Sequence, residues 1–445
     1  LRDLPERQRS LRAVFDHSWR LLDDEERAAL ARLAIFQGGF ERDAAAAVAG
    51  ASLPILLNLA SKSLIRRTES GRYDLHEAVR QYAYARLGEM PDCRETCDRH
   101  SRFYLARLDG REPALHSRAQ RQILRDLTAE SDNLRAAWDW AVQRGLFDAL
   151  APATRGFGCL FELSGWLDEG VARLEAAIQA VSRASVEESL RRRLAGEARA
   201  QQALLLMRHG NFVASLQRAN DSLALLRPLG DPNPLVRPLI FGSIIQHMTG
   251  ELDASRAACE EAMAHARATN DCWGAAYADF LLGYVTHLRG EHQAGYARMR
   301  DRLRLWRESG DPHSIALGLN FFSPVAIHLG HFAEAEASLR ESLELGRQVG
   351  DRWSIGTSLR FLGLVALRQG DAGAAQELLR RSLEVHRGVV TGWDLARSLI
   401  YLAEAGLALG DVAEARACYA EALVMAEEAG SPPLAAEARA GLAGL

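Results

Sequence analysis

A glycine recurs every 40 residues through the second half of the chain, and this spacing limits the possible folds more than any other feature. The series is Gly210, Gly250, Gly290, Gly330, Gly370 and Gly410. Each glycine separates two stretches with helical periodicity, which is typical of a helix that ends at glycine and a second helix that begins just after it. A period of this length predicts a repeat protein built from helical hairpins.

Small residues recur on both sides of each glycine in the same register. Antiparallel helices approach closely only where neither helix has a bulky side chain at the crossing point. We therefore expect the two helices of each hairpin to cross at these positions. The column before the glycines is Ala203, Ser243, Gly283, Ser323, Gly363 and Ala403, and the column after them is Ser215, Ser255, Gly295, Ala335, Ala375 and Ala415.

Part of this pattern resembles the tetratricopeptide (TPR) signature. The matching residues are Leu282-Gly283, Leu362-Gly363 and the run from Gly370 to Ala375. The period exceeds the usual TPR period of about 34 residues, so the helices should be longer. We expect residues 146–445 to form a right-handed, TPR-like α-solenoid of about seven hairpins, with stability shared between neighbours.

Residues 1–90 do not share the repeat. Helical periodicity over residues 12–22, 25–36, 42–48 and 53–61 is followed by two short segments, 63–67 and 72–75, around a Thr-Glu-Ser-Gly turn. Helices followed by a β-hairpin predict a winged-helix domain over residues 1–90. Residues 91–145 should form a helical connector with the first solenoid helices, so the whole chain is mainly all-α.

Several segments resemble bacterial STAND-class regulators, the signal transduction ATPases with numerous domains. The resemblance is close over residues 1–145 and architectural beyond. It implies a nucleotide-binding domain before the winged helix and a TPR arm that senses an inducer, either a small molecule or a protein. Because the chain begins with Leu1, we expect that domain to lie upstream in a parent protein. The matching segments are Leu4 to Leu11, Leu33 to Phe40, Leu57 to Leu64, Leu75 to Ala83 and Glu130 to Trp138.

His76 matches a motif histidine of the STAND winged helix, with Leu75 and Glu77 in place of the usual Met and Asp. The resemblance implies that this histidine reaches the β-phosphate of bound ADP. The alternative is a histidine that only caps a helix or packs on the hairpin. The sequence has no G-x-x-x-x-G-K-[ST] motif, and Lys62 is its single lysine. We therefore expect no catalytic activity and no cofactor in this chain, with ADP or ATP bound only by the parent protein.

Other functions find less support in the sequence. The expected recognition helix, Ser52 to Lys62, is almost wholly apolar, which argues against DNA contact because base recognition needs polar and basic side chains. Only Lys62, Arg66 and Arg67 are candidates for such contact, and a DNA-binding regulator working through the winged helix stays open as an alternative. Cys93, Cys97 and His100 share a helical face but have no fourth ligand, so we expect no metal. The net charge is −4 and no apolar run reaches membrane-spanning length, so we expect a cytoplasmic chain without membrane contact.

The usual TPR geometry places the first helix of each hairpin on the concave face. Positions that should face this groove combine aromatic rings with arginine, histidine and asparagine, which suits binding of an inducer or a peptide carboxylate. An ordinary solvated helix face is the alternative, and a free-standing TPR scaffold for peptides stays open as a function. The adjacent column of the repeat is almost uniformly apolar and should belong to the core; it comprises Phe241, Leu281, Phe321, Phe361 and Tyr401. The candidate groove residues are Arg237, His247, Tyr277, Phe280, Tyr284, His287, Asn320, Arg360 and Arg397.

Overall fold

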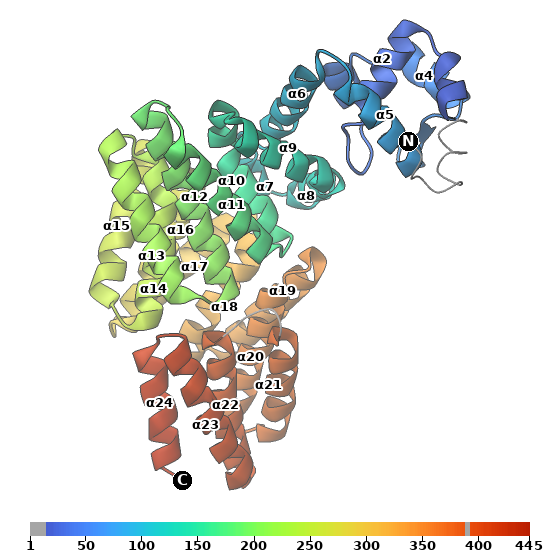
Figure 1. The fold of residues 1–445 in the computed structure, drawn as a ribbon. Helices are drawn as coiled ribbons and strands as arrows, with labels where there is room; N and C mark the ends of the chain where they lie inside the picture. Colours follow the sequence, from blue (N-terminus) through green and yellow to red (C-terminus); the bar gives the residue numbers. More distant parts are fainter. Residues whose placement is uncertain (1–14, 388–391) are drawn as a thin grey trace. The chain divides into compact units, whose positions relative to one another are not determined.

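A computed structural model describes residues 15–387 and 392–445 of the chain. It contains two compact units: Leu1–Asp109 with Arg125–Ala153, and Gly110–Leu124 with Thr154–Leu445. The chain therefore enters the second unit, leaves it after Leu124 and enters it again at Thr154 (Figure 1). Two sequence predictions concern residues outside this description: the STAND-like segment Leu4 to Leu11 and the start of the helix expected over residues 12–22.

The first unit combines short helices with one β-hairpin. Strand β1 pairs antiparallel with β2, with Arg66 opposite Asp74, which confirms the predicted hairpin. Asp23 caps α2 through a capping box with Glu26. The elements are α2 (Asp24–Leu33), α3 (Arg42–Ala44), the π-helix η1 (Ala45–Ala49), α4 (Leu53–Ser61), β1 (Arg66–Arg67), β2 (Tyr73–Asp74), α5 (Glu77–Gly88), α6 (Cys93–Ala106) and α9 (Ser131–Arg144).

Asn133 of α9 joins two segments that are far apart in the sequence. Its amide Nδ2 donates to the carbonyl of Gly39 at 2.8 Å, and its Oδ1 accepts from the backbone N–H of Gln37 at 2.7 Å. Gly39 has a φ of +85°, and a Cβ there would lie 2.8 Å from the Tyr73 carbonyl oxygen. Two of the segments that carry the STAND resemblance, around Gly39 and Asn133, therefore meet in the fold.

The second unit is a stack of helical hairpins, which confirms the predicted α-solenoid. Consecutive helices pair from α12/α13 to α22/α23 over the described residues, and all six repeat glycines adopt positive φ where a first helix ends. The first helices are α12 (Glu188–His209), α14 (Val236–Thr249), α16 (Cys272–Leu288), α18 (Pro312–His328), α20 (Arg352–Arg368) and α22 (Trp393–Ala408). The second helices are α13 (Phe212–Leu226), α15 (Leu252–Ala268), α17 (His292–Ser309), α19 (Phe332–Val349), α21 (Ala372–His386) and α23 (Val412–Glu428).

Further elements flank these hairpins. Residues 110–124 form an inserted segment of the second unit, which contains α7 (Glu112–Leu115) and the start of α8 (Gln120–Ala129). Helices α10 (Phe147–Leu163) and α11 (Leu167–Arg183) precede the repeats, and α24 (Pro432–Ala443) follows them. The turns η2 (Arg227–Leu229) and η3 (Asn233–Leu235) connect the first hairpin to the second.

The small-residue columns face each other at the hairpin crossings, as predicted. The Ser215 hydroxyl donates to the Ala203 carbonyl at 2.7 Å, and the Ser243 and Ser255 hydroxyl oxygens are 3.0 Å apart. In α17, a Cβ at Gly295 would lie 2.5 Å from the Gly283 carbonyl oxygen, so these two helices are in backbone contact.

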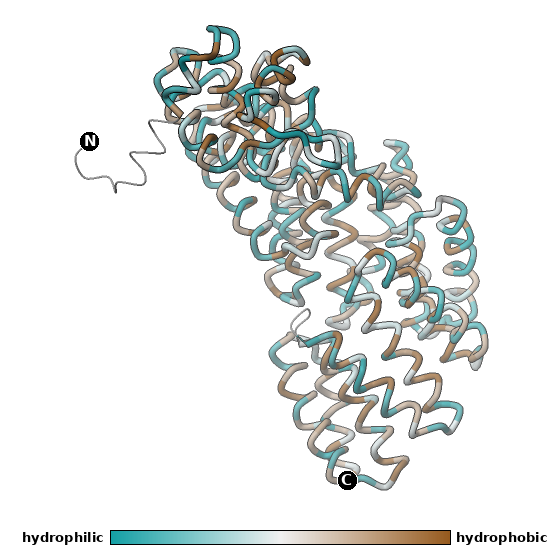
Figure 2. The backbone as a smooth tube through the Cα atoms, turned by 90° about the vertical axis from the view of Figure 1, so that its right-hand side faces the viewer, coloured by the Kyte–Doolittle hydropathy of each residue, from teal (hydrophilic) through white to brown (hydrophobic). Residues whose placement is uncertain are grey.

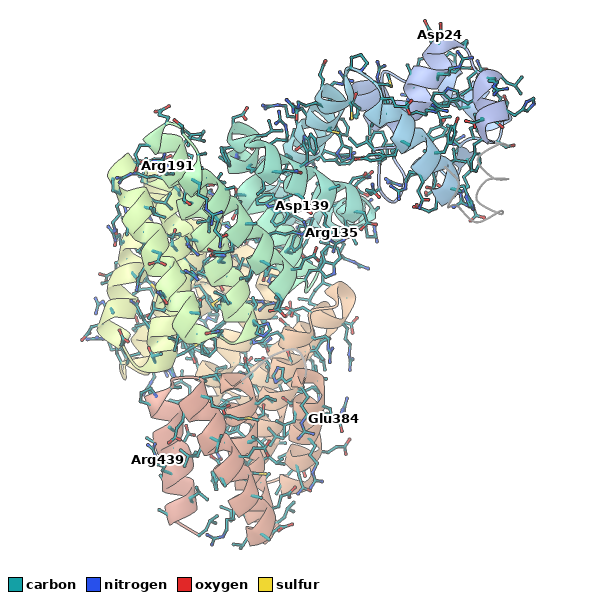
Figure 3. The ribbon with its side chains drawn as sticks, in the orientation of Figure 1. Asp24, Arg135, Asp139, Arg191, Glu384 and Arg439 are labelled. Atoms are coloured by element: carbon teal, nitrogen blue, oxygen red, sulfur yellow. The ribbon has the colours of Figure 1, made fainter. Side chains whose placement is uncertain are left out.

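The helices of the solenoid differ in amphipathicity: α19 and α21 bury one face, whereas α14 is buried on almost every side. Hydrophobic and hydrophilic residues alternate along them (Figure 2), and charged side chains such as Asp24, Glu384 and Arg439 are exposed on the two units (Figure 3). No single helix within the described residues is long and apolar enough to cross a membrane. The segments Arg42–Ala49 and Leu53–Ser61 reach that length and apolarity only as a pair, with a bend of 104° between them. The domain boundaries predicted at residues 90 and 145 stay predictions.

Candidate ligand-binding cavity

The second unit encloses a cavity of about 380 Å³. Its walls come from the first helices of successive hairpins, α12, α14, α16, α18, α20 and α22, together with α7, α10 and the start of α24. The repeat explains this arrangement, because equivalent positions 40 residues apart lie on the same side of the stack. Most of the lining is apolar or aromatic.

Eight of the nine candidate groove residues line this cavity: Arg237, His247, Tyr277, Tyr284, His287, Asn320, Arg360 and Arg397. The ninth, Phe280, does not. Its ring is buried in the core, with its centroid 4.8 Å from that of Trp306. The adjacent column belongs to the core as expected, because Phe241, Leu281 and Phe361 are buried in it and Phe321 and Tyr401 pack against it. Four of these side chains, Phe241, Phe321, Phe361 and Tyr401, also line the cavity. The first helix of each hairpin therefore presents a wider face to the cavity than the TPR geometry predicted, because both the groove column and the adjacent column reach it.

Arg237 pairs with two acids in the cavity wall. Its guanidinium donates to Glu112 at 2.6 Å and to Asp271 at 3.1 Å, and its centre lies 4.1 Å from the ring centroid of Trp273. Burial favours the neutral form of Glu112, but the positive charges of Arg237 and Arg155 outweigh it and lower the pKa of Glu112 to about 2. This side of the wall is therefore a buried, balanced ion-pair network.

The inserted segment supplies residues that sequence reasoning missed. The His116 ring stacks on Trp273 with centroids 4.4 Å apart, and its Nδ1 is 3.6 Å from Asp311. The Gln120 amide donates to the same aspartate at 3.1 Å. Residues 110–124 have no repeat register, so they were predicted only as part of a connector. The pair Glu112-Pro113 is a normal helix start, so the sequence did not indicate that Glu112 would line a cavity.

A second network joins α10, α12, α18 and the N-cap residue of α20. Arg208 lies 3.1 Å from Glu162 and 3.3 Å from Asp351. The two His313 nitrogens lie 3.5 Å from Glu162 and 3.4 Å from Asp351. Burial lowers the pKa of His313, but attraction by Glu162 and hydrogen bonding to Asp351 outweigh it and raise the pKa to about 10. His313 is therefore a cation at neutral pH.

The remaining arginines of the wall are also paired. Arg360 donates to Asp394 at 2.7 Å and Arg397 to Glu437 at 2.5 Å. Burial lowers the pKa of His247 to about 4, so this ring is neutral at pH 7. The polar groups of the cavity wall that lack a hydrogen-bond partner in the part of the chain that the structure describes are therefore mostly uncharged. Among the described residues of the wall, the hydroxyls of Tyr277, Tyr284, Tyr401 and Thr357 and the amide oxygen of Gln201 have no protein hydrogen-bond partner.

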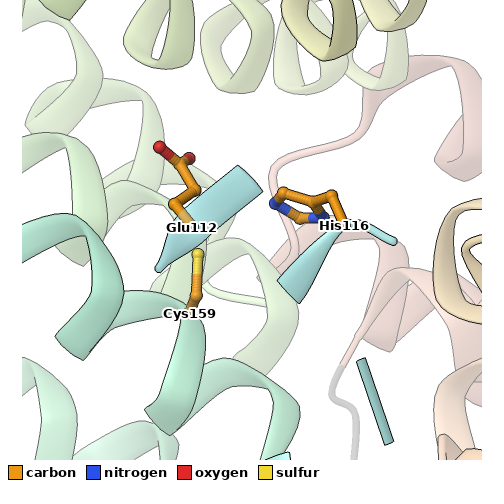
Figure 4. A group of neighbouring side chains, drawn as sticks. All are labelled: Glu112, His116 and Cys159. Atoms are coloured by element: carbon orange, nitrogen blue, oxygen red, sulfur yellow. The ribbon is translucent and has the colours of Figure 1, made fainter. Parts of the chain in front are cut away.

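Glu112, His116 and Cys159 form a compact group in this wall, with ligand-type atoms within 4.8 Å of one another (Figure 4). The arrangement does not favour a cation. Glu112 is already paired with Arg237, and Arg155 lies 3.7 Å from its carboxylate. Burial raises the pKa of the Cys159 thiol well above its usual value, so it is no ready thiolate ligand.

His76 begins α5 and is exposed. Its Nδ1 accepts from the backbone N–H of Ala78 at 3.3 Å, so the neutral ring carries its proton on Nε2. It borders a hollow with Gly38, Gly39 and Arg80. The capping role is thus present, and the nucleotide-sensing role stays a prediction.

The other candidate residues of the first unit have protein partners. His100 is buried, 3.4 Å from the Asn133 amide oxygen, and burial lowers its pKa to about 4. Burial raises the pKa of Cys97 to about 12. Lys62 pairs with Glu26 and Arg66 with Asp74, which neutralises two of the three basic residues considered for DNA contact.

Comparisons with known proteins agree with the repeat fold. A tetratricopeptide repeat family matches residues 324–388, and the family described as anaphase-promoting complex subunit 5 matches residues 358–434. Relatives named as HTH-type transcriptional regulators, from Mycobacterium tuberculosis and Mycobacterium bovis, are 31% identical over 311 residues. That match covers 66% of this chain and 34% of the relatives, so the chain spans about a third of their length.

Two solved structures share the architecture. A STAND protein with a tetratricopeptide repeat sensor from Pyrococcus horikoshii has a TM-score of 0.54 at 12% identity, covering 93% of this chain and 65% of that protein. A Rap protein complexed with Competence and Sporulation Factor has a TM-score of 0.53 at 12% identity, covering 79% and 92% respectively. At this identity the likeness concerns the fold: a TPR-type solenoid found in sensor and regulator proteins.

Proposed function

We propose that this chain is the sensor region of a STAND-class regulator, with a winged-helix domain and a TPR arm that binds an inducer. The cavity carries this proposal, because successive repeats and an inserted segment contribute to one mainly apolar wall that includes ten phenylalanine, tyrosine and tryptophan side chains. The mycobacterial relatives named as transcriptional regulators and the STAND protein of similar fold support it.

The inducer of this proposal is an uncharged small molecule, largely aromatic or aliphatic. The cavity has the volume of ordinary small-molecule sites, which span about 300–1,000 Å³. A charged ligand would need an unpaired counter-charge, yet Arg237, Arg360 and Arg397 already pair with acids. The phenol hydroxyls, the Thr357 hydroxyl and the Gln201 amide oxygen can instead orient neutral polar groups of a ligand.

The inserted segment is the proposed route of coupling. Glu112 and His116 line the cavity, while the chain on both sides of residues 110–124 belongs to the first unit. A ligand that binds better to one placement of α7 than to another would shift the equilibrium between them. The winged helix would pass this change to a nucleotide-binding domain of the parent protein, where His76 contacts ADP through its Nε2 proton. This chain itself would hydrolyse no ATP.

A free-standing scaffold for peptides is the second candidate. The similar Rap structure, a complex with Competence and Sporulation Factor, supports this candidate. The paired states of Lys62 and Arg66 make DNA contact through α4 the weakest candidate. A gel shift by the purified chain at physiological salt would overturn that ranking.

The parent protein offers the test of the sensor assignment. We expect the His76→Ala variant to retain less ADP after purification and to signal more without inducer, because a contact specific to the resting state is lost. The matched control is Glu89→Ala at the other end of α5, where both readouts should equal wild type. Unchanged ADP content and basal output in His76→Ala would remove His76 from the proposal.

A further inference from the structure

Three imidazoles from successive helices meet beside the cavity wall. His287 lies near the end of α16, His292 is the first residue of α17, and His328 is the last residue of α18. The ring centroids are 4.7 Å apart for His287 and His292, 4.1 Å for His292 and His328, and 5.2 Å for His287 and His328.

The closest ring nitrogens face each other without an acid between them. The Nδ1 atoms of His287 and His292 are 3.1 Å apart. Within the described residues, none of the three rings forms an ion pair, and none has a further contact beyond its ring neighbours and this nitrogen pair. Three imidazole rings therefore lie in contact with one another, with no carboxylate among their hydrogen-bond and ion-pair partners in the described part of the chain. Over residues 15–387 and 392–445, the polar contact of this cluster is the single N–H···N hydrogen bond between His287 and His292.

We propose that His287, His292 and His328 bind one divalent transition-metal ion of the zinc class. Zinc binds imidazole nitrogen at about 2.0–2.1 Å, so tetrahedral geometry separates two ligand nitrogens by about 3.3 Å. The 3.1 Å separation of the His287 and His292 nitrogens matches this spacing. Imidazole ligands suit Zn²⁺, Ni²⁺, Cu²⁺ and Co²⁺, whereas Mg²⁺ and Ca²⁺ prefer oxygen.

The third ligand requires a side-chain adjustment only. Three imidazoles on one tetrahedral ion have ring centroids about 5 Å apart, so the His328 ring must turn and move outward from His292. His328 is exposed and can do so without disturbing the core. His287 is buried and His292 half-buried, which holds two ligands in place and leaves a fourth position for water or an added molecule.

The site differs from the inducer cavity in its chemistry but shares His287 with it. A metal ion there would fix the ends of α16 and α18 and the start of α17 to one another. It therefore adds a metal-dependent contribution to the stability of two adjacent repeats. This inference does not depend on the STAND assignment.

Cobalt binding tests the proposal directly. The complete chain, freed of metal with a chelator, is titrated with Co²⁺ and followed by visible absorption, and Zn²⁺ is then added as competitor. We expect the chain to bind one equivalent of Co²⁺, with the visible absorption bands of nitrogen ligation, and we expect Zn²⁺ to displace the bound Co²⁺. His292→Ala and His328→Ala should each weaken binding at least about tenfold, since even outer-shell partners of metal ligands are worth about 10–100-fold. His265→Ala, on α15, is the control and should bind as wild type.

Absence of stoichiometric Co²⁺ binding, or unchanged Co²⁺ affinity in both histidine variants, would overturn the proposal. A thiolate charge-transfer band would also overturn it, because it would assign the ion to cysteines such as the exposed Cys272. Circular dichroism establishes that each variant is folded. If an alanine variant is unfolded, the glutamine variants His292→Gln and His328→Gln are measured instead. The proposal requires that they also bind Co²⁺ at least about tenfold more weakly than wild type.

Discussion

The guanidinium of Arg237 donates to the carboxylate of Glu112 at 2.6 Å, across 125 positions of the chain. Both side chains are buried, and each has a second opposite charge, Asp271 for the arginine and Arg155 for the glutamate. This pair fixes the inserted segment to the solenoid wall. Together with the stacking of His116 on Trp273, it links residues 110–124 to the cavity wall.

Neutralising Glu112 should destabilise the second unit. We expect Glu112→Gln to lower the free energy of unfolding by about 3 kcal/mol, the lower end for a broken buried ion pair, because Asp271 still pairs with Arg237. Urea unfolding monitored by tryptophan fluorescence measures the change, with Trp273 next to the site. Glu260→Gln removes an exposed ion pair with Arg256 and should leave the urea midpoint unchanged. Equal midpoints for both variants would mean that the buried pair contributes nothing.

The His313 network predicts a dependence of stability on alkaline pH. Its pKa is raised in the fold, from 6.5 to about 10, so protonated His313 contributes fully below pH 6.5 and progressively less up to pH 10. The stability advantage of wild type over His313→Gln should therefore shrink by up to about 1.4 kcal/mol per pH unit in this window. Urea unfolding of both proteins at several pH values between 6.5 and 10 measures it. An advantage that stays constant would contradict a protonated His313.

Backbone contact at the hairpin crossing predicts a sharp difference between two glycines. Gly295→Ala places a Cβ 2.5 Å from the Gly283 carbonyl oxygen, so α16 and α17 must separate. We expect a loss of about 1–3 kcal/mol, the usual range for overpacking. Gly373→Ala, near the start of α21, meets nothing closer than 3.8 Å and should be neutral or slightly stabilising. Thermal unfolding of the two variants compares them, and similar melting temperatures would mean that the crossing tolerates a methyl group.

The repeat allowed much of this fold to be predicted from the sequence. Glycine spacing located the helix ends, and small residues such as Ser243 and Ser255 located the crossings, because both depend on local chain geometry. The same register brought Arg237, Tyr284 and Arg360 to one cavity, although they belong to different repeats.

What sequence reasoning missed depends on non-local packing. Glu112 and His116 enter the wall from outside the repeat, so no periodic pattern could identify them. Phe280 was expected on the groove, but its position in α16 turns it toward Trp306. Arg360 fits a binding column by its residue type, yet burial beside Asp394 gives it a structural role that only the fold reveals.

Binding of Nile red, an uncharged fluorescent dye, tests the central claim that the solenoid cavity takes an uncharged apolar ligand. Leu317→Trp enlarges a side chain of the cavity wall, and Leu407→Trp makes the same change on α22 away from the wall. We expect saturable binding by wild type and Leu407→Trp, and binding at least about tenfold weaker in Leu317→Trp, because a filled cavity cannot hold the dye. No saturable binding by wild type, or equal affinity in the two variants, would contradict the account.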